Sequence, residues 1–335
     1  MKVKLTAALL ASATVVTGGS AAAEDGFSWE GELEIGVDQV YDSNTPGNEI
    51  RDTYGILSLG ASYRFPNSFE IFGVITAESL TDPTADRSFD DVGAYIEELG
   101  IRYTFGSTTI SAGKLHPVFG TAWDDTAGFY GSGFAEDYEL IEQIGILTDT
   151  EIGSGVLSFG VFYADDTGLS RSAGFKRGRN TTAAGGAGNT GELDNLAVQW
   201  TQSVGDTHYH VGARYLSAGL GDVDDEVGVV LGAGHTFFSA LDLYGEVASF
   251  SNFGGGVDDA TYVTLNAAYA IGNLTLSGTL ARRDLDTAGD ADLATIAAEY
   301  EFANGWTVGA ALAHVDDSGV KDDLFGINLI IPFGG

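Results

Sequence analysis

Apolar and polar residues alternate with a period of two along most of the chain, in segments of roughly ten residues. In residues 53–65 one set of alternate positions is apolar, namely Leu57, Leu59, Ala61, Tyr63 and Phe65, while the other set is polar or small. Residues 259–269 repeat the pattern. Because successive side chains of a β-strand point to opposite faces, these segments predict strands that separate an apolar from a polar environment.

Sixteen such segments can be counted, and the connections between them alternate in length. The predicted strands lie near 27–41, 53–65, 69–79, 91–105, 108–115, 139–149, 156–165, 193–203, 207–217, 227–237, 240–250, 259–270, 273–285, 291–302, 305–315 and 322–333. Seven short turns interleave with eight longer loops. This order predicts an all-β protein, a 16-stranded antiparallel transmembrane β-barrel with its short turns at the periplasmic end.

The N-terminus indicates export. Lys2 and Lys4 precede an apolar stretch over residues 5–16, and small residues end in Ala23. This is the pattern of a cleaved signal peptide, and the apolar stretch is too short to span a membrane as a helix. We therefore predict a signal peptide over residues 1–23 and a single barrel domain over residues 24–335.

Composition narrows the function classes. The chain has no cysteine, which excludes a disulfide scaffold, and it has 48 Asp and Glu against 15 Lys and Arg. Such an acidic excess opposes nucleic-acid binding. The 44% of hydrophobic residues argues against disorder. No arrangement of nucleophile, base and orienting group stands out, although His208 and His210 share one predicted face, so we expect no enzyme and no cofactor.

The last strand has one fully apolar face that ends in an aromatic residue. Its alternate positions are Phe325, Ile327, Leu329, Ile331 and Phe333. This resembles the C-terminal targeting strand of outer-membrane barrels, except that Gly334 and Gly335 follow the aromatic residue. Since an open sheet edge in lipid leaves backbone groups unpaired, we expect this strand to pair with the strand near 27–41.

By strand count, loop order and terminal strand, the chain resembles the general porins, in particular the acidic porins of alphaproteobacteria. The resemblance covers the mature chain and implies a homotrimer in the outer membrane of a Gram-negative bacterium, with a water-filled channel for passive diffusion of small hydrophilic solutes and ions. In that family the third long loop folds into the barrel and narrows it. Here this loop is residues 116–138, and Pro117 to Gly120 resemble its start.

The residues of the third loop favour the same placement. A long loop with five aromatic residues would be anomalous in water, whereas against the barrel wall its rings can be buried. The loop also carries the acidic residues that we expect at the constriction: Asp124, Asp125, Glu136 and Asp137. An extracellular lid or receptor-binding loop remains the alternative.

An acidic loop needs basic residues opposite it to produce a transverse field. Strand alternation puts Arg64, Arg102, Arg214 and Arg283 in the lumen, and Lys114 lies beside the loop. Glutamates outnumber these cations on the same faces, so we predict a preference for cations. For any single residue, a solvated lumen position without effect on selectivity is the alternative. Glu97 and Arg282 fall on the lipid-facing alternation, which indicates a register change, a position near an interface, or, for Glu97, a subunit contact.

Two loops carry other candidate chemistry. Asp222, Asp224 and Asp225 are oxygen ligands that suit Ca²⁺, with solvated loop charge as the alternative. The fourth long loop carries cations that suit lipopolysaccharide phosphates, with a mobile solvated loop tip as the alternative: Arg171, Lys176, Arg177 and Arg179. A substrate-selective porin, or a non-channel barrel such as an enzyme or adhesin, remains open as an alternative function.

Overall fold

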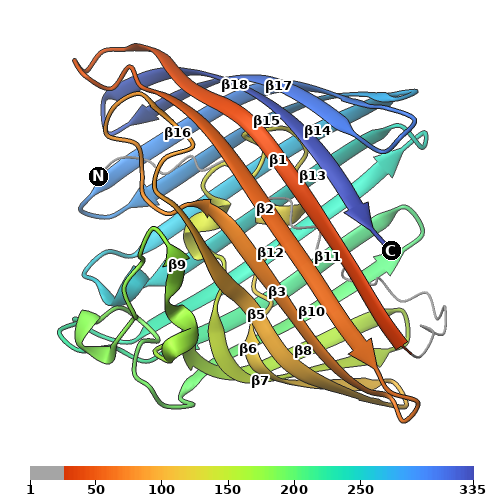
Figure 1. The fold of residues 1–335 in the computed structure, drawn as a ribbon. Coiled ribbons are helices and arrows are strands. Elements are labelled where there is room, and N and C mark those ends of the chain that lie inside the picture. Colours follow the sequence, from red (N-terminus) through yellow and green to blue (C-terminus); the bar gives the residue numbers. More distant parts are fainter. Residues whose placement is uncertain (1–25) are drawn as a thin grey trace.

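The structure, a computed structural model, describes residues 26–335. The predicted signal peptide at residues 1–23 lies outside the described residues, and so does the expected mature start at Glu24. The described chain forms one barrel of long tilted strands (Figure 1). Short turns lie at one end of the barrel, on the right in Figure 1, and the longer loops lie at the other end.

Sixteen long antiparallel strands make the wall, each paired with the next around the ring. They are β1 (Gly26–Ser43), β2 (Arg51–Arg64), β3 (Phe69–Ser79), β5 (Val92–Phe105), β6 (Thr108–Leu115), β7 (Gln143–Ile152), β8 (Gly155–Ala164), β10 (Asn195–Val204), β11 (Thr207–Leu216), β12 (Glu226–Phe237), β13 (Leu241–Ser251), β14 (Ala260–Ile271), β15 (Leu274–Leu285), β16 (Gly289–Glu301), β17 (Thr307–Asp317) and β18 (Val320–Gly334). The short strands β4 (Arg87–Ser88) and β9 (Ser172–Gly174) pair with β2 and β5 in the loops. The predicted 16-stranded barrel is confirmed.

The first and last strands close the ring. β1 and β18 are antiparallel, with Leu33 opposite Ile331 and Val37 opposite Ile327. The pairing continues to Gly334, which lies opposite Glu30, and the rings of Trp29 and Phe333 lie 6.1 Å apart. Closure removes the unpaired edge that a bilayer does not tolerate.

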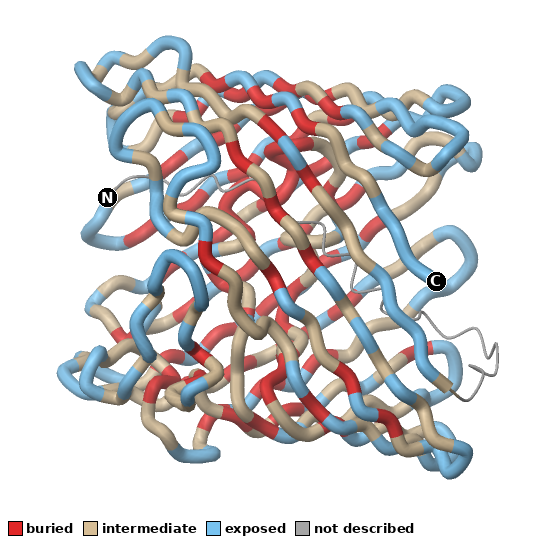
Figure 2. Tube along the Cα trace, viewed as in Figure 1, coloured by how far each residue is buried: buried red, intermediate tan, exposed pale blue. Residues whose placement is uncertain are grey.

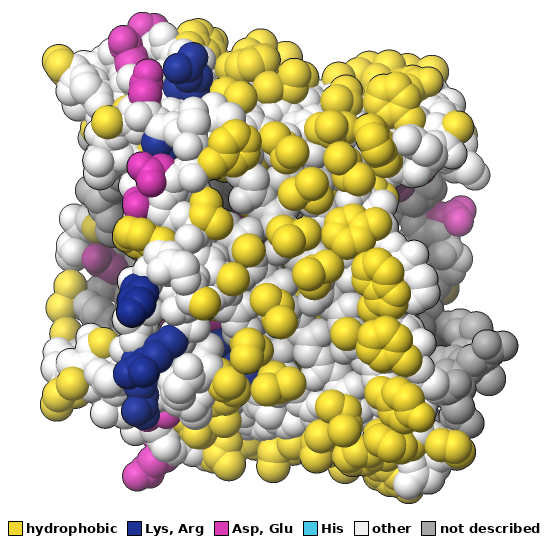
Figure 3. All heavy atoms as spheres, in the orientation of Figure 1, with side chains coloured by type: hydrophobic (Ala, Val, Ile, Leu, Met, Phe, Trp, Pro, Cys, Tyr) yellow, Lys and Arg dark blue, Asp and Glu magenta, His cyan; other side chains and the backbone are white. Residues whose placement is uncertain are grey.

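The wall is apolar outside and polar inside. Hydrophobic side chains cover the outer face between the two ends of the barrel (Figure 3), whereas buried residues follow every second position of the strands (Figure 2). In β12, for example, the outward Leu231 is 61% exposed while its neighbour Val230 is buried. Aromatic residues such as Tyr63, Tyr103 and Tyr300 lie outside near the short turns. This is the distribution that a hydrocarbon layer with an aromatic border requires.

Helical structure in residues 26–335 occurs only as short turns in loops: α1 (Ala122–Asp125), η1 (Ala135–Tyr138), η2 (Gly168–Ser170), η3 (Thr182–Ala184) and η4 (Phe253–Gly255). Within these residues no helix has the length and apolar character needed to cross a bilayer. The first two turns belong to the third long loop, which lies inside the barrel.

One predicted strand is displaced, and the other fifteen agree with the structure to within two residues at each end. The segment predicted as strand 139–149 is β7, which begins only at Gln143. Glu142 has a φ of +54°, a left-handed conformation that interrupts a strand ladder. Residues 139–142 therefore extend the third loop beyond its predicted end at 138.

A β-bulge explains the apparent lipid-facing position of Glu97. In the β3–β5 pair, Val74 lies opposite Glu98 and Ile75 opposite Ile96, so Glu97 is the extra residue. A bulge moves one residue out of the alternation and re-aims its side chain. Glu97 accepts a hydrogen bond from the inward Thr76 hydroxyl and lines the lumen.

Arg282 keeps its outward position. Its guanidinium lies 2.5 Å from the carboxylate of Asp290 and 2.9 Å from that of Asp292, on the exposed face near the long-loop end of β15 and β16. The charge is therefore placed at an interface and is paired there, not at the middle of the hydrocarbon layer.

Candidate functional site

The third long loop, residues 116–142, narrows the lumen from within. Glycines allow its sharp course along the wall. Gly120 and Gly128 have φ values of +72° and +104°, which other residues rarely adopt. A Cβ atom on Gly128 would also lie 2.6 Å from the Ser277 hydroxyl of β15, so this glycine permits the close approach of loop and wall.

Aromatic side chains pack the loop against the wall. The buried rings are Phe119, Phe129, Tyr130, Phe134 and Tyr138. Tyr138 contacts Tyr262 of β14 at a centroid distance of 5.1 Å and Phe250 of β13 at 5.7 Å. Burial of several aromatic rings is a large stabilising contribution, so the loop is held as part of the barrel.

Glu246 of β13 is the main polar anchor of the loop. Its carboxylate accepts hydrogen bonds from the Thr121 backbone N–H at 2.7 Å and from the Tyr138 hydroxyl at 2.5 Å. It also lies 2.7 Å from Nε2 of His210 on β11. The backbone N–H of Gly120 donates to Gln199 at 2.8 Å. Three strands of the wall, β10, β11 and β13, and both halves of the loop therefore meet in one buried cluster.

Arg214 and Arg283, both predicted at the constriction, anchor the loop, and Arg283 also lines the luminal cavity. The buried Arg214 guanidinium lies 2.7 Å from Glu226, donates to the Tyr138 carbonyl at 2.5 Å, and lies over the rings of Phe119 and Phe250. Strand alternation correctly predicts that it points inward, but the loop covers it.

Arg283 has the same role at the same helical turn, η1. It pairs with Asp137 at 3.0 Å and with Asp317 at 3.3 Å, and its guanidinium lies over the ring of Phe134. Asp137, predicted as a free acidic constriction residue, is thereby neutralised on the loop side.

Lys114 is also not a constriction residue. Its side chain is fully buried and its Nζ lies 2.9 Å from Glu142 and 3.0 Å from Asp165. It also donates to the carbonyl of Leu169 at 3.2 Å. The lysine ties the end of the third loop to the fourth long loop, a contact between distant segments that strand alternation does not predict.

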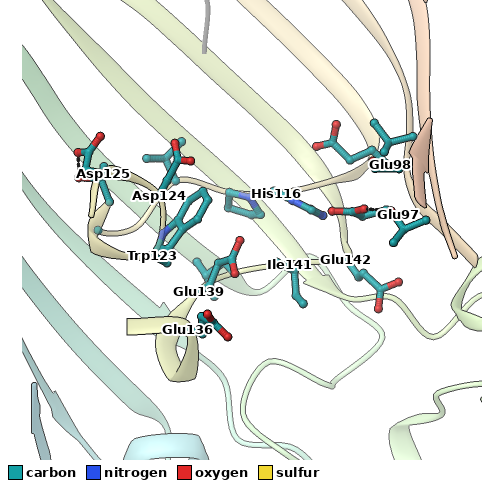
Figure 4. A pocket seen from close by; sticks show the side chains of 18 of the residues that line it. Glu97, Glu98, His116, Trp123, Asp124, Asp125, Glu136, Glu139, Ile141 and Glu142 are labelled. Atoms are coloured by element: carbon teal, nitrogen blue, oxygen red, sulfur yellow. Dashed lines mark hydrogen bonds between the residues drawn. The ribbon is translucent and has the colours of Figure 1, made fainter. Parts of the chain in front are cut away.

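The lumen beside the loop is a cavity of about 2880 Å³. The four predicted acidic residues, Asp124, Asp125, Glu136 and Asp137, all line it, and so does Arg102. Trp123, Glu139 and Glu97 line it as well, although strand alternation does not predict this position for any of the three. Figure 4 shows Trp123, Asp124, Glu136 and Glu139 grouped on the loop, with His116, Glu97 and Glu98 toward the wall.

The luminal cations are all paired. Glu70 lies 2.6 Å from Arg64 and 3.5 Å from Arg102. Arg87 pairs with Asp52 at 2.5 Å. Arg177, expected in a surface cluster, instead reaches Glu142 at 2.6 Å and stacks on the ring of Tyr95. Arg64 and Arg102 are about one third exposed, so these two are the predicted basic residues that face the water of the lumen.

Several luminal carboxylates have no such partner. Within residues 26–335, no Lys or Arg nitrogen lies within 4.0 Å of the following residues: Glu97, Glu98, Asp124, Glu136 and Glu139. These carboxylates have no paired cation, so the lumen beside the third loop becomes negative as they ionise.

The loop carboxyls titrate near neutral pH. Burial, and to a smaller extent the neighbouring Asp125, raises the pKa of Asp124 to about 6. Burial raises the pKa of Glu139 to about 7 and that of Glu136 to about 8, although the Ser132 hydroxyl donates to Glu136. The negative charge of the constriction therefore increases as the pH rises from 6 to 8.

The aspartates considered for Ca²⁺ do not converge. Asp222 accepts from the backbone N–H groups of Gly186 and Gly219, and Asp225 from the Tyr215 hydroxyl. Asp224 accepts from the backbone N–H of Asp225. In the described part of the chain, no three acidic, histidine or cysteine side chains are arranged to hold a metal ion. These carboxylates stabilise loop turns.

The fold and sequence were compared with known proteins. A mutant of the porin from Rhodobacter blastica matches with a TM-score of 0.64 at 17% identity, over 92% of this chain and 100% of that protein. OprB from Pseudomonas putida matches with a TM-score of 0.69 at 14% identity, over 92% and 94%. At these identities the likeness shows the fold alone.

No curated protein matches the sequence. The sequence profile described as Gram-negative porin, however, matches residues 6–320. This match spans most of the chain, and the fold is that of solved porin barrels. The chain therefore belongs to the Gram-negative porin family.

Proposed function

We propose that this outer-membrane porin is a passive diffusion channel for small hydrophilic solutes and ions, with a preference for cations. One observation carries the proposal. Among the described residues, five carboxylates on and beside the third loop have no Lys or Arg nitrogen within 4.0 Å, namely Glu97, Glu98, Asp124, Glu136 and Glu139, whereas each luminal arginine is paired. A narrow aqueous passage lined by uncompensated negative charge favours cations over anions.

The size of the lumen supports diffusion without binding of one dedicated solute. The cavity is large and open along the barrel, and polar side chains line it from many strands. As a member of the porin family the protein is a channel and not an enzyme. An uncharged solute that reduces the current at low concentration would instead favour the substrate-selective alternative.

Planar-bilayer recording with charge-neutralised variants tests the proposal. We expect Asp124→Asn combined with Glu139→Gln to lower the ratio of potassium to chloride permeability and to leave the conductance in concentrated salt nearly unchanged. Asp225→Asn, in an extracellular loop, is the matched control. An unchanged ratio in the double variant would remove these carboxylates from the selectivity site.

The resemblance to general porins leads us to propose a homotrimer as well. Conductance that rises in groups of three equal steps, and a detergent-solubilised mass of three chains by light scattering, is the expected result. A monomeric mass together with single steps would contradict it. Mass spectrometry of the mature protein, with Glu24 as the expected first residue, tests the export signal.

We propose lipopolysaccharide phosphates as partners of the fourth long loop. Arg171, Lys176 and Arg179 are exposed. Within residues 26–335 none of the three lies within 4.0 Å of a carboxylate, which is unusual in so acidic a chain. Charge-assisted hydrogen bonds to phosphate suit such a cluster. Replacing all three by Gln should reduce the lipopolysaccharide that copurifies with the protein, and equal amounts would contradict this partner.

A further inference from the structure

We infer that the constriction binds small organic cations, about the size of an amino acid, whose ammonium or guanidinium group is carried on an apolar stem. The binding residues are Trp123, Asp124, Glu139 and His116. The inference rests on the proposed cation preference and deepens it, because it names the class of cation for which the channel has a site.

Trp123 is not required for selectivity among inorganic ions, because that selectivity needs only charged groups. It lies in α1, where the Thr121 carbonyl accepts the backbone N–H groups of Asp124 and Asp125 at 2.9 Å and 2.7 Å. The indole packs in part against the buried aromatic cluster and also lines the lumen. It is therefore held in place with part of its surface free. A hydrated potassium ion gains little from an indole, whereas an organic cation gains both cation–π attraction and apolar contact.

Two unpaired carboxylates lie on either side of this indole. Figure 4 shows Trp123 between Asp124 and Glu139. The negative charge of Asp124 contributes to the raised pKa of Glu139, after burial and the charge of Glu97. In the described chain neither has a Lys or Arg nitrogen within 4.0 Å. A guanidinium or ammonium group over the indole therefore has carboxylate acceptors within reach for charge-assisted hydrogen bonds.

His116 supplies an acceptor that has no donor. The residue lines the same cavity, and its Nε2 atom is buried and has no hydrogen-bond partner within residues 26–335. Burial lowers the pKa of His116, so the ring is neutral, and the ring is hydrogen-bonded to the backbone of Glu97. A neutral imidazole that donates through one nitrogen accepts through the other. Buried polar atoms are rarely left unpaired, and an N–H group of a bound cation would satisfy this one.

The arginines of the opposite wall do not neutralise the carboxylates of this site. Arg64 and Arg102 lie on β2 and β5, and both are directed to Glu70. Arg177 is held by Glu142 and by the ring of Tyr95. No free cation among the described residues competes for the carboxylates beside Trp123, so the site is open to a cation from solution.

The test is block of the potassium current by arginine in single-channel recordings of the mature porin. Citrulline is the matched solute, because it has nearly the same shape but a neutral ureido group. We expect arginine to reduce the current at concentrations at which citrulline has no effect. Trp123→Leu should raise the half-blocking concentration of arginine by about two- to fivefold, and Trp123→Phe by less. His116→Phe, which keeps a ring of similar size, should also raise it.

Trp306→Phe, on the outer face near a short turn, is the control for loss of an indole and should leave the block unchanged. The ratio of potassium to chloride permeability separates the two proposals. If Trp123→Leu weakens the block and keeps this ratio, the organic-cation site is supported. If arginine blocks no better than citrulline while the ratio still favours potassium, the site is refuted and the cation preference stands. A ratio that does not favour potassium overturns the proposed function itself.

Discussion

His210 on β11 and Glu246 on β13 face each other inside the barrel wall, with Nε2 of the imidazole 2.7 Å from the carboxylate. Glu246 in turn accepts hydrogen bonds from Thr121 and Tyr138, at the two ends of the inner loop. Together with Arg214 and Arg283, this buried carboxylate therefore holds the loop in position and so contributes to the width of the channel.

Replacing Glu246 by Leu should therefore loosen the loop. The substitution leaves the Thr121 N–H and the Tyr138 hydroxyl without their acceptor, at a cost of about 1–3 kcal/mol for each unpaired buried group. We expect a lower urea midpoint and additional conductance levels in single-channel records. Asp242→Asn, near the short-turn end of the same strand, should change neither. A single conductance level equal to that of the wild type would refute the anchoring role.

The structure distinguishes two arginines that sequence alternation treats alike. Arg214→Met removes one partner of a buried ion pair with Glu226 and should cost about 3–5 kcal/mol of stability. Arg102→Gln removes a partly exposed charge that shares Glu70 with Arg64, so it should raise the preference for potassium with little loss of stability. Urea unfolding and reversal potentials measure the two effects. The reverse ranking of the variants in either assay would show that their roles are wrongly assigned.

Selectivity should depend on pH. The pKa values of Asp124, Glu139 and Glu136 are raised to about 6, 7 and 8, so each group is neutral below its pKa and negative above it. We expect the ratio of potassium to chloride permeability to fall as the pH is lowered from 8 to 6. A variant with all three residues changed to their amides should respond less over this interval. If wild type and variant show equal pH dependence, other carboxylates set the selectivity.

A substitution at Leu231 tests which face of the barrel wall contacts lipid. Leu231 lies in the middle of β12 with its side chain outward. Leu231→Arg should cost about 2–4 kcal/mol, as expected for an arginine at the bilayer midplane. Val223→Arg, in an exposed loop, should cost little. Reversible unfolding from lipid vesicles measures both, and equal stabilities would contradict the assigned membrane region.

Much of the wall is predictable from the sequence, because a strand with water on one side and lipid on the other must alternate. Alternation predicts that Arg64, Arg102, Arg214 and Arg283 point inward, and all four do. It carries no information about what covers an inward side chain. Only the packed loop reveals that Arg214 is buried while Arg102 meets water.

Local departures from the strand alternation are harder to predict from the sequence. Glu97 and Glu98 are adjacent acidic residues in an otherwise alternating strand, and that pair was the available signal of the bulge. Residues 139–142 directly precede the alternating segment that forms β7, but the conformation of Glu142 ends the ladder. The contact of Arg177 with Glu142 joins two long loops, and no periodic pattern predicts such a contact.

The most direct test of the account is the reversal potential of the wild-type porin across a bilayer with a potassium chloride gradient at pH 8, where the loop carboxyls are largely ionised. The account predicts a potential of the sign that the potassium gradient sets, because the constriction is negative. A potential near zero, or one set by chloride, would contradict it.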